Sequence, residues 1–217
     1  MRFILATVLA AGTLTGATPS PRAEPFSFRG LTLGASLTEL RRMRYPEAPA
    51  ARILCSHDAE ARDIRPTADF VASQEETQAG VKVCGAFLFT RALPASNVLP
   101  PEWLPARVKV ATVAVAPAFW FVSAEGGDQD GDARLYRIAM RSNSAFWEET
   151  RAAFINRYGK PTTTDKGVTA TARATVENET LTWSNAVSTI RLVKRDQFPN
   201  RMLITFHHHA LTPGAQP

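Results

Sequence analysis

The sequence predicts an α+β fold, an antiparallel β-sheet with two helices packed on one face. Apolar residues follow a helical spacing in two segments, which begin near Ser36 and near Ser144. Several other runs alternate between apolar and polar residues and are separated by turn residues. Because these strands follow one another instead of alternating with helices, we expect them to pair antiparallel.

The first predicted helix begins at a capping box. Ser36 and Glu39 have the spacing at which a serine and a glutamate cap the same helix N-terminus. Leu37 and Leu40 then face inward, and Pro46 ends the helix.

The second predicted helix spans Ser144 to Tyr158. Gly159 and Pro161 follow it and stop it. Its inward stripe is expected to consist of Phe146, Trp147, Thr150, Ala153, Phe154 and Tyr158. Such a helix should lie flat on a sheet.

The strands are expected in both halves of the chain. The first half holds an alternating run at 81–90, and segment 107–123 pairs with 133–141 as a hairpin. After the second helix, a meander is predicted with strands at 179–183, 187–194 and 201–208.

The two halves of the chain share a pattern. Residues 24–106 and residues 107–217 each hold a helix and strands, and the Pro-rich segment 92–106 connects them. A tandem of two similar helix-plus-strands modules is therefore a hypothesis, although no residue-level repeat supports it.

The first 23 residues have the layout of a secretory signal peptide. Met1 and Arg2 precede an apolar core of about a dozen residues, which is shorter than a membrane-spanning helix needs. Cleavage after Ala17 or after Ala23 fits the small residues that follow, and the pattern leaves both open. A buried N-terminal helix is less favoured because Pro19 would break it. We therefore expect a periplasmic or secreted protein without a membrane span.

Cys55 and Cys84 are the two cysteines of the chain. In an exported protein we expect them to form a disulfide. A reactive thiol pair is the alternative, but the tight Cys-x-x-Cys spacing typical of redox pairs is absent.

Net charge gives little support for a nucleic-acid partner. The chain has 25 basic and 20 acidic residues, and removal of Arg2 and Arg22 leaves 23 against 20, or +3. Basic and acidic residues are interspersed, which is typical of a solvated surface.

Three segments together resemble a group of small bacterial envelope proteins. They are Gly30 to Leu40 near the expected mature start, Phe154 to Pro161 at the end of the second helix, and Trp183 at the opening of the strands. The set resembles the modules of the outer-membrane-assembly lipoprotein called small protein A and of the β-lactamase inhibitory protein. The resemblance covers about half of the expected mature chain. It implies a helix-backed sheet that serves binding, as an assembly component or an inhibitor, and it transfers no site.

The histidines near the C-terminus are a candidate metal site. On a strand, His207 and His209 would share one face with Thr205, while His208 would lie on the other. Such a pair can bind zinc or copper when a third ligand is near, and His57 is a candidate. The alternative is an exposed strand end.

Trp103, Leu104 and Leu99 are the predicted partner-binding residues. Trp103 lies between Pro101 and Pro105, and a stiff loop that presents an aromatic side chain loses little entropy on binding. The alternative is that Trp103 folds back onto its own sheet edge.

Motifs for catalysis are weak. Asp128, Asp130 and Asp132 have the opening spacing of a calcium loop, but Gly131 is out of place and Ala139 stands where a glutamate is needed, so a turn is favoured. The hydrolase motifs Gly-x-Ser-x-Gly and His-Glu-x-x-His are absent. We therefore expect neither an enzyme nor a cofactor.

Together these patterns favour a soluble, exported, non-catalytic protein that binds an envelope protein partner or assists envelope assembly. Its open sheet face or the 92–106 segment would meet the partner. Two alternatives remain: an envelope metal-binding protein that uses the C-terminal histidines, and a hydrolase whose catalytic residues meet only in space.

Overall fold

The computed structural model describes residues 23–64, 70–89, 103–123, 131–170, 175–195 and 200–213. Residues 1–22 of the predicted signal peptide 1–23 lie outside these residues, as do Leu99, Asp128 and Asp130. Among the described residues, each helix is too short or too polar to span a bilayer.

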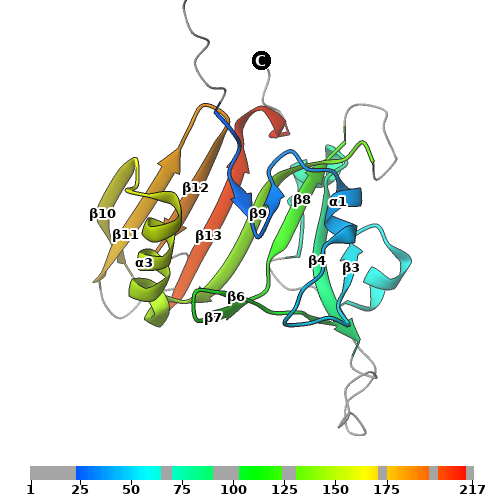
Figure 1. Cartoon of the computed structure of the whole chain (residues 1–217), viewed down its shortest axis with the longest axis horizontal. Helices are drawn as coiled ribbons and strands as arrows, with labels where there is room; N and C mark the ends of the chain where they lie inside the picture. Colours follow the sequence, from blue (N-terminus) through cyan, green and yellow to red (C-terminus); the bar gives the residue numbers. More distant parts are fainter. Residues whose placement is uncertain are drawn as a thin grey trace, which may run out of the picture.

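One antiparallel sheet of nine strands runs through the molecule (Figure 1). Its strand order is β10-β11-β12-β13-β9-β8-β4-β3, and β5 pairs with β4 beside this path. The sheet strands are β3 (Arg52–Cys55), β4 (Lys82–Phe89), β5 (Trp103–Pro105), β8 (Ala118–Val122), β9 (Arg134–Asn143), β10 (Thr163–Ala170), β11 (Thr175–Ser184), β12 (Ser188–Val193) and β13 (Arg201–His208). The predicted α+β fold class with antiparallel strands is confirmed.

Short helices and two hairpins complete the chain. The helices are α1 (Leu37–Arg42), α2 (Gln74–Gln78) and α3 (Trp147–Tyr158), and the 3-10 turns are η1 (Ala59–Asp63), η3 (Ser144–Phe146) and η4 (His209–Leu211). The hairpins are β1 (Ser27–Phe28) with β2 (Leu31–Thr32), and β6 (Val108–Val110) with β7 (Val113–Val115).

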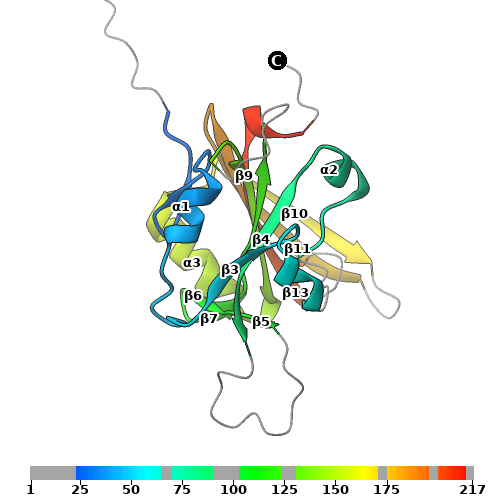
Figure 2. The same ribbon diagram turned by 90° about the vertical axis from the view of Figure 1, so that its right-hand side faces the viewer.

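Helices α1 and α3 lie on the same side of the sheet, together with the β6–β7 hairpin, whereas α2 and η1 lie on the opposite side (Figure 2). The main core is on the α3 side. Leu37 and Leu40 of α1 belong to the same buried cluster as Trp147 and Phe154 of α3. This side of the sheet is called the core face below, and the other side the far face.

The capping box that opens α1 is present. The Ser36 Oγ accepts a hydrogen bond from the backbone N–H of Glu39 at 3.2 Å, and the Glu39 carboxylate accepts one from the Ser36 N–H at 2.7 Å. Hydrogen bonds from Ser36 lower the pKa of Glu39 because they stabilise its charged form. The sequence pattern therefore located this helix start correctly.

Helix α3 packs with one face on the sheet, with one correction to the predicted stripe. Trp147, Thr150 and Phe154 are buried as expected, but Phe146 is 41% exposed. Phe146 belongs to the 3-10 turn that precedes the helix, and its side chain is therefore not on the helical stripe. Gly159 ends the helix at a φ of 79°, which favours glycine.

Strand β4 is buried on both faces. The alternation at 81–90 predicted a strand with one apolar face, and the structure confirms the strand. Val83 is buried on the far face and Cys84 on the core face. Because β4 lies between β3 and β8 and both sides of the sheet are covered there, even Lys82 is only 8% exposed.

The pairing of β8 with β9 and the meander β11–β12–β13 confirm the predicted hairpin and strands. Strand β10 was not predicted. Its sequence, Thr-Thr-Asp-Lys-Gly-Val-Thr-Ala, has little apolar alternation because it is an edge strand that pairs with β11 alone among the described strands.

Candidate functional site

The far face of strands β9 to β13 is the first candidate site. On β12 and β13 the core-face residues are buried, whereas the far-face residues between them are half-buried or exposed. The strand registers place the following residues on the far face: Arg137, Arg141, Asn178, Thr180, Thr182, Ser184, Thr189, Arg191, Arg201, Leu203, Thr205, His207, Thr163 and Asp165. This set is called the open face.

Charge on the open face is strongly unbalanced. The strands contribute four arginines, Arg137, Arg141, Arg191 and Arg201, and the acidic side chain of the set is Asp165. Of the four, Arg137 forms an ion pair with the Glu76 carboxylate of α2 at 2.9 Å. Arg191 is exposed at the centre of the face, in one cross-strand row with Thr182 and Thr205. The open face is therefore a cationic surface.

Hydroxyl side chains surround the arginines. The Ser184 and Thr189 hydroxyls lie 3.0 Å apart, and the Thr189 hydroxyl lies 2.7 Å from Nε2 of His209. These contacts fix the end of the open face near η4. The face thus combines hydroxyl groups held by hydrogen bonds with cationic side chains.

Helix α2 borders the open face on the same side of the sheet. The Glu76 carboxylate accepts hydrogen bonds from the Tyr136 hydroxyl and from Arg137 Nη1, each at 2.9 Å. Tyr136 and Arg137 are adjacent in sequence and both reach Glu76 because of a β-bulge. The register shifts between Trp120 and Phe121, which leaves Tyr136 as an extra residue on β9. Burial and the Glu76 carboxylate raise the pKa of Tyr136, so this phenol stays a donor.

A cavity of about 730 Å³ is the second candidate site. It forms where the sheet splits. Strand β8 pairs with β4 and with β9 only as far as Ala118. Beyond that point β4 pairs with β5, and β9 continues to Asn143 beside β13. The cavity lies between these two diverging parts of the sheet. The β6–β7 hairpin supplies part of its wall. The volume is within the range of small-molecule sites.

The wall of this cavity is mostly apolar. Phe87, Leu104 and Phe146 line it, and Leu104 and Phe146 are 37% and 41% exposed. Its charged lining residues among the described ones are Arg107 and Arg141. No carboxylate or histidine of the described residues lines it.

Of the predicted partner-binding residues, Trp103 is buried and Leu104 is exposed. Trp103 pairs with Phe89, is 9% exposed and packs with Leu54 and Phe87, and the Arg52 guanidinium lies 5.3 Å from its ring centroid. Leu104 lines the cavity, while Leu99 lies outside the described residues. Partner contact by these residues stays a prediction, and the geometry favours Leu104.

The three C-terminal histidines have different surroundings. His207 Nε2 lies 3.2 Å from the Thr212 hydroxyl, and His209 begins a 3-10 turn instead of continuing β13. Burial lowers the pKa of His207, and nearby Arg137 adds to this effect; burial also lowers the pKa of His208. Among the described residues no group of three or more His, Cys, Asp or Glu is arranged to hold a metal. The third ligand that the metal hypothesis needs is thus not found there.

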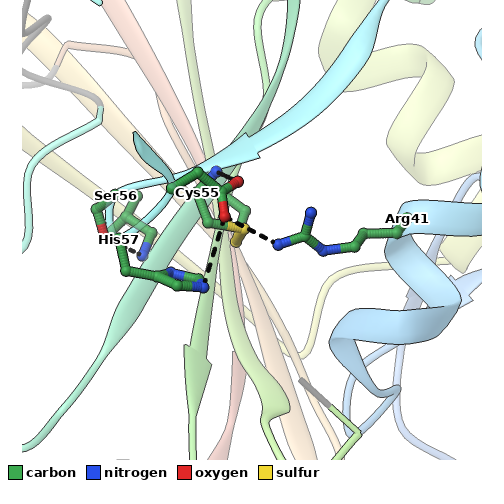
Figure 3. Close-up of a disulfide and its surroundings, with 7 residues drawn as sticks. Arg41, Cys55, Ser56 and His57 are labelled. Carbon is green, nitrogen blue, oxygen red and sulfur yellow. Dashed lines mark hydrogen bonds and ion pairs between the residues drawn. A yellow bond between two sulfur atoms is a disulfide. The ribbon is translucent and has the colours of Figure 1, made fainter. Parts of the chain in front are cut away.

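The disulfide between Cys55 and Cys84 is confirmed and joins β3 to β4 (Figure 3). Both residues are fully buried. The Asp58 carboxylate accepts a hydrogen bond from the Cys55 N–H at 2.8 Å and one from Arg41 at 3.1 Å, which ties α1 to the strand. Burial makes a structural role the better interpretation than a reactive thiol pair.

Sequence reasoning expected a partner at the open sheet face or at segment 92–106, and it named His207 and Leu104, but it did not single out the arginines of either candidate site. The strand alternation could have placed Arg191 and Arg201 on the polar side of their strands, since it placed His207 and Thr205 there. Nothing in the local pattern could have placed Arg107 and Arg141 in the lining of one cavity, because this depends on where β8 ends.

Comparison with known proteins gives no further assignment: no family model, curated protein or solved structure matches this chain. Its function therefore has to be argued from the two sites alone.

Proposed function

We propose that the protein is a non-catalytic binding protein of an oxidising, extracytoplasmic compartment, and that its open face binds an acidic surface of a protein partner. The observation that carries this proposal is the excess of arginine over acidic side chains on the open face. The buried disulfide supports the compartment, since disulfides persist where thiols are oxidised.

Charge complementarity identifies the kind of partner. Arg191 is exposed, and the described residues offer it no ion-pair partner within the chain. The surrounding threonine hydroxyls donate and accept hydrogen bonds, so they match the carboxylates and backbone groups of a protein surface. Arginine is the cation best suited to such contacts because its guanidinium binds carboxylates through two parallel hydrogen bonds.

The proposal also includes the two-module interpretation. Helices α1 and α3 contribute to one core on one face of the sheet, and each is followed by antiparallel strands. The open face would then belong to the second module and its border helix α2 to the first.

Photo-crosslinking from position 182 tests the partner proposal. Thr182 is half-buried beside Arg191, so a photoreactive residue there would contact a bound partner. In cells that make the protein, we expect one recurrent adduct, identified by mass spectrometry, whose partner presents an acidic surface. Its yield should fall as salt concentration rises.

Matched charge reversals provide the control. Arg191→Glu should abolish the adduct, whereas Arg44→Glu, at an exposed position after α1, should leave it unchanged. An adduct that survives Arg191→Glu, or no adduct from position 182, would overturn the proposal.

A further inference from the structure

The lining of the cavity between β5 and β9 has the character of a site for a small amphiphile. It is distinct from the proposed partner surface, because half of its lining residues belong to β4, β5 and the β6–β7 hairpin. Arg141 alone is shared between the two.

Exposed apolar side chains are concentrated at this cavity. Val71, Leu104, Phe146 and Val168 are the large apolar residues that are exposed in the described part of the chain, and two of them, Leu104 and Phe146, line the cavity. Exposed apolar groups that gather in a concave site mark a place where an apolar ligand is bound.

The far wall of the cavity depends on a glycine. The Phe70 and Phe87 rings pack edge to face at 4.9 Å, and both line the cavity. A Cβ on Gly85 would lie 3.0 Å from the Phe87 ring, so a larger residue at this position would press on the ring. Gly85 therefore allows an aromatic wall to form on the sheet surface.

The charged groups of the cavity all have one sign. Arg107 is exposed at its border, Arg141 is half-buried, and both are cationic. Glu149 accepts a hydrogen bond from the hydroxyl of the lining residue Thr112, but it is not itself part of the described lining. An apolar wall beside two guanidinium groups matches a molecule with an apolar body and one anionic group.

We propose that this cavity binds an alkyl monocarboxylate, with the chain against Leu104, Phe87 and Phe146 and the carboxylate at Arg107 and Arg141. The apolar chain would be removed from water and supply most of the affinity. The carboxylate would form charge-assisted hydrogen bonds and supply the preference over uncharged analogues.

Isothermal titration calorimetry with decanoate and decanol tests this proposal on the purified protein. We expect decanoate to bind at one site about tenfold or more tightly than decanol, because a hydrogen bond to a charged group is worth that much. Equal affinities would overturn the assignment of the anionic group, and no binding of either compound would overturn the site.

Two variants separate the roles of charge and volume. Arg107→Gln should weaken decanoate binding without affecting decanol, and Arg107→Gln/Arg141→Gln should reduce decanoate to the affinity of decanol, while Arg44→Gln should change neither. Ala114→Trp should remove binding of both, because Ala114 is exposed and lines the cavity, whereas Ala152→Trp on the exposed side of α3 should not. Decanoate binding that persists in Ala114→Trp would place the ligand elsewhere.

Calorimetry with decanoate also distinguishes the cavity proposal from the partner proposal. Arg191→Glu should leave decanoate affinity unchanged, since Arg191 does not line the cavity. Loss of decanoate binding in Arg191→Glu would show that the amphiphile binds the open face, which contradicts the cavity assignment.

Discussion

The two ends of the sheet differ in how many of their faces are buried. In β4 and β8 the side chains on both faces are buried, with Val83 and Trp120 on the far face and Cys84 and Phe119 on the core face. In β12 and β13 the core face is buried and the far face is not. At these positions the first region is covered on both faces, while far-face residues of the second region are half-buried or exposed.

The two regions should differ most in how much free energy of unfolding is lost when a far-face side chain is removed. Trp120 is 2% exposed, and Arg137 lies 4.2 Å from its ring centroid. Trp120→Ala should lower the free energy of unfolding by about 3–5 kcal/mol, because it leaves a cavity. Thr182→Ala on the open face should change it by about 0.5 kcal/mol or less. Urea unfolding followed by circular dichroism measures both, and similar losses would contradict the distinction.

The disulfide should be the next largest contribution. Cys55 and Cys84 are 29 residues apart, and a loop of this length corresponds to about 3–4 kcal/mol on the chain-entropy model. The double variant Cys55→Ser/Cys84→Ser should lose about this much in urea unfolding. Reduction of the wild-type protein should have the same effect and should leave the double variant unchanged.

The attachment of α2 to the sheet should be weaker but measurable. Glu76→Gln removes the charge that holds Tyr136 and Arg137, and hydrogen bonds to charged groups are worth about 1.5–3 kcal/mol. Glu60→Gln is the matched control, since its pair with Arg52 is exposed and should contribute about 1 kcal/mol or less. An equal loss in both variants would show that α2 is not held by Glu76.

Acidification should destabilise the folded protein in part through His207 and His208. Burial holds the pKa of His207 and His208 below their ordinary value, so the unfolded chain binds protons first as the pH falls. Their contribution to stability is therefore complete above about pH 6.5, declines as the pH falls below it, and is fully lost below the folded-state pKa values. Urea midpoints measured across this range should fall with pH, and less so in His207→Gln/His208→Gln. An unchanged pH dependence in that variant would contradict this assignment.

Local patterns predicted several elements accurately. The Ser36–Glu39 capping box located α1, and alternation located β4, β12 and β13. The same patterns failed for Phe146, which precedes the helix, and for β10, which has little core to bury. Where a segment contributes few buried residues, its sequence carries little periodic signal.

Periodicity, caps and composition were enough to predict the secondary structure around each buried stripe, the antiparallel α+β class and the candidate disulfide. Only the tertiary structure decided that Leu104 lines a cavity, that Trp103 is buried, and that Arg107 and Arg141 border the same site. Such contacts depend on strand order and on the residue at which β8 ends. Those features arise from long-range pairing, which no local stretch of sequence encodes.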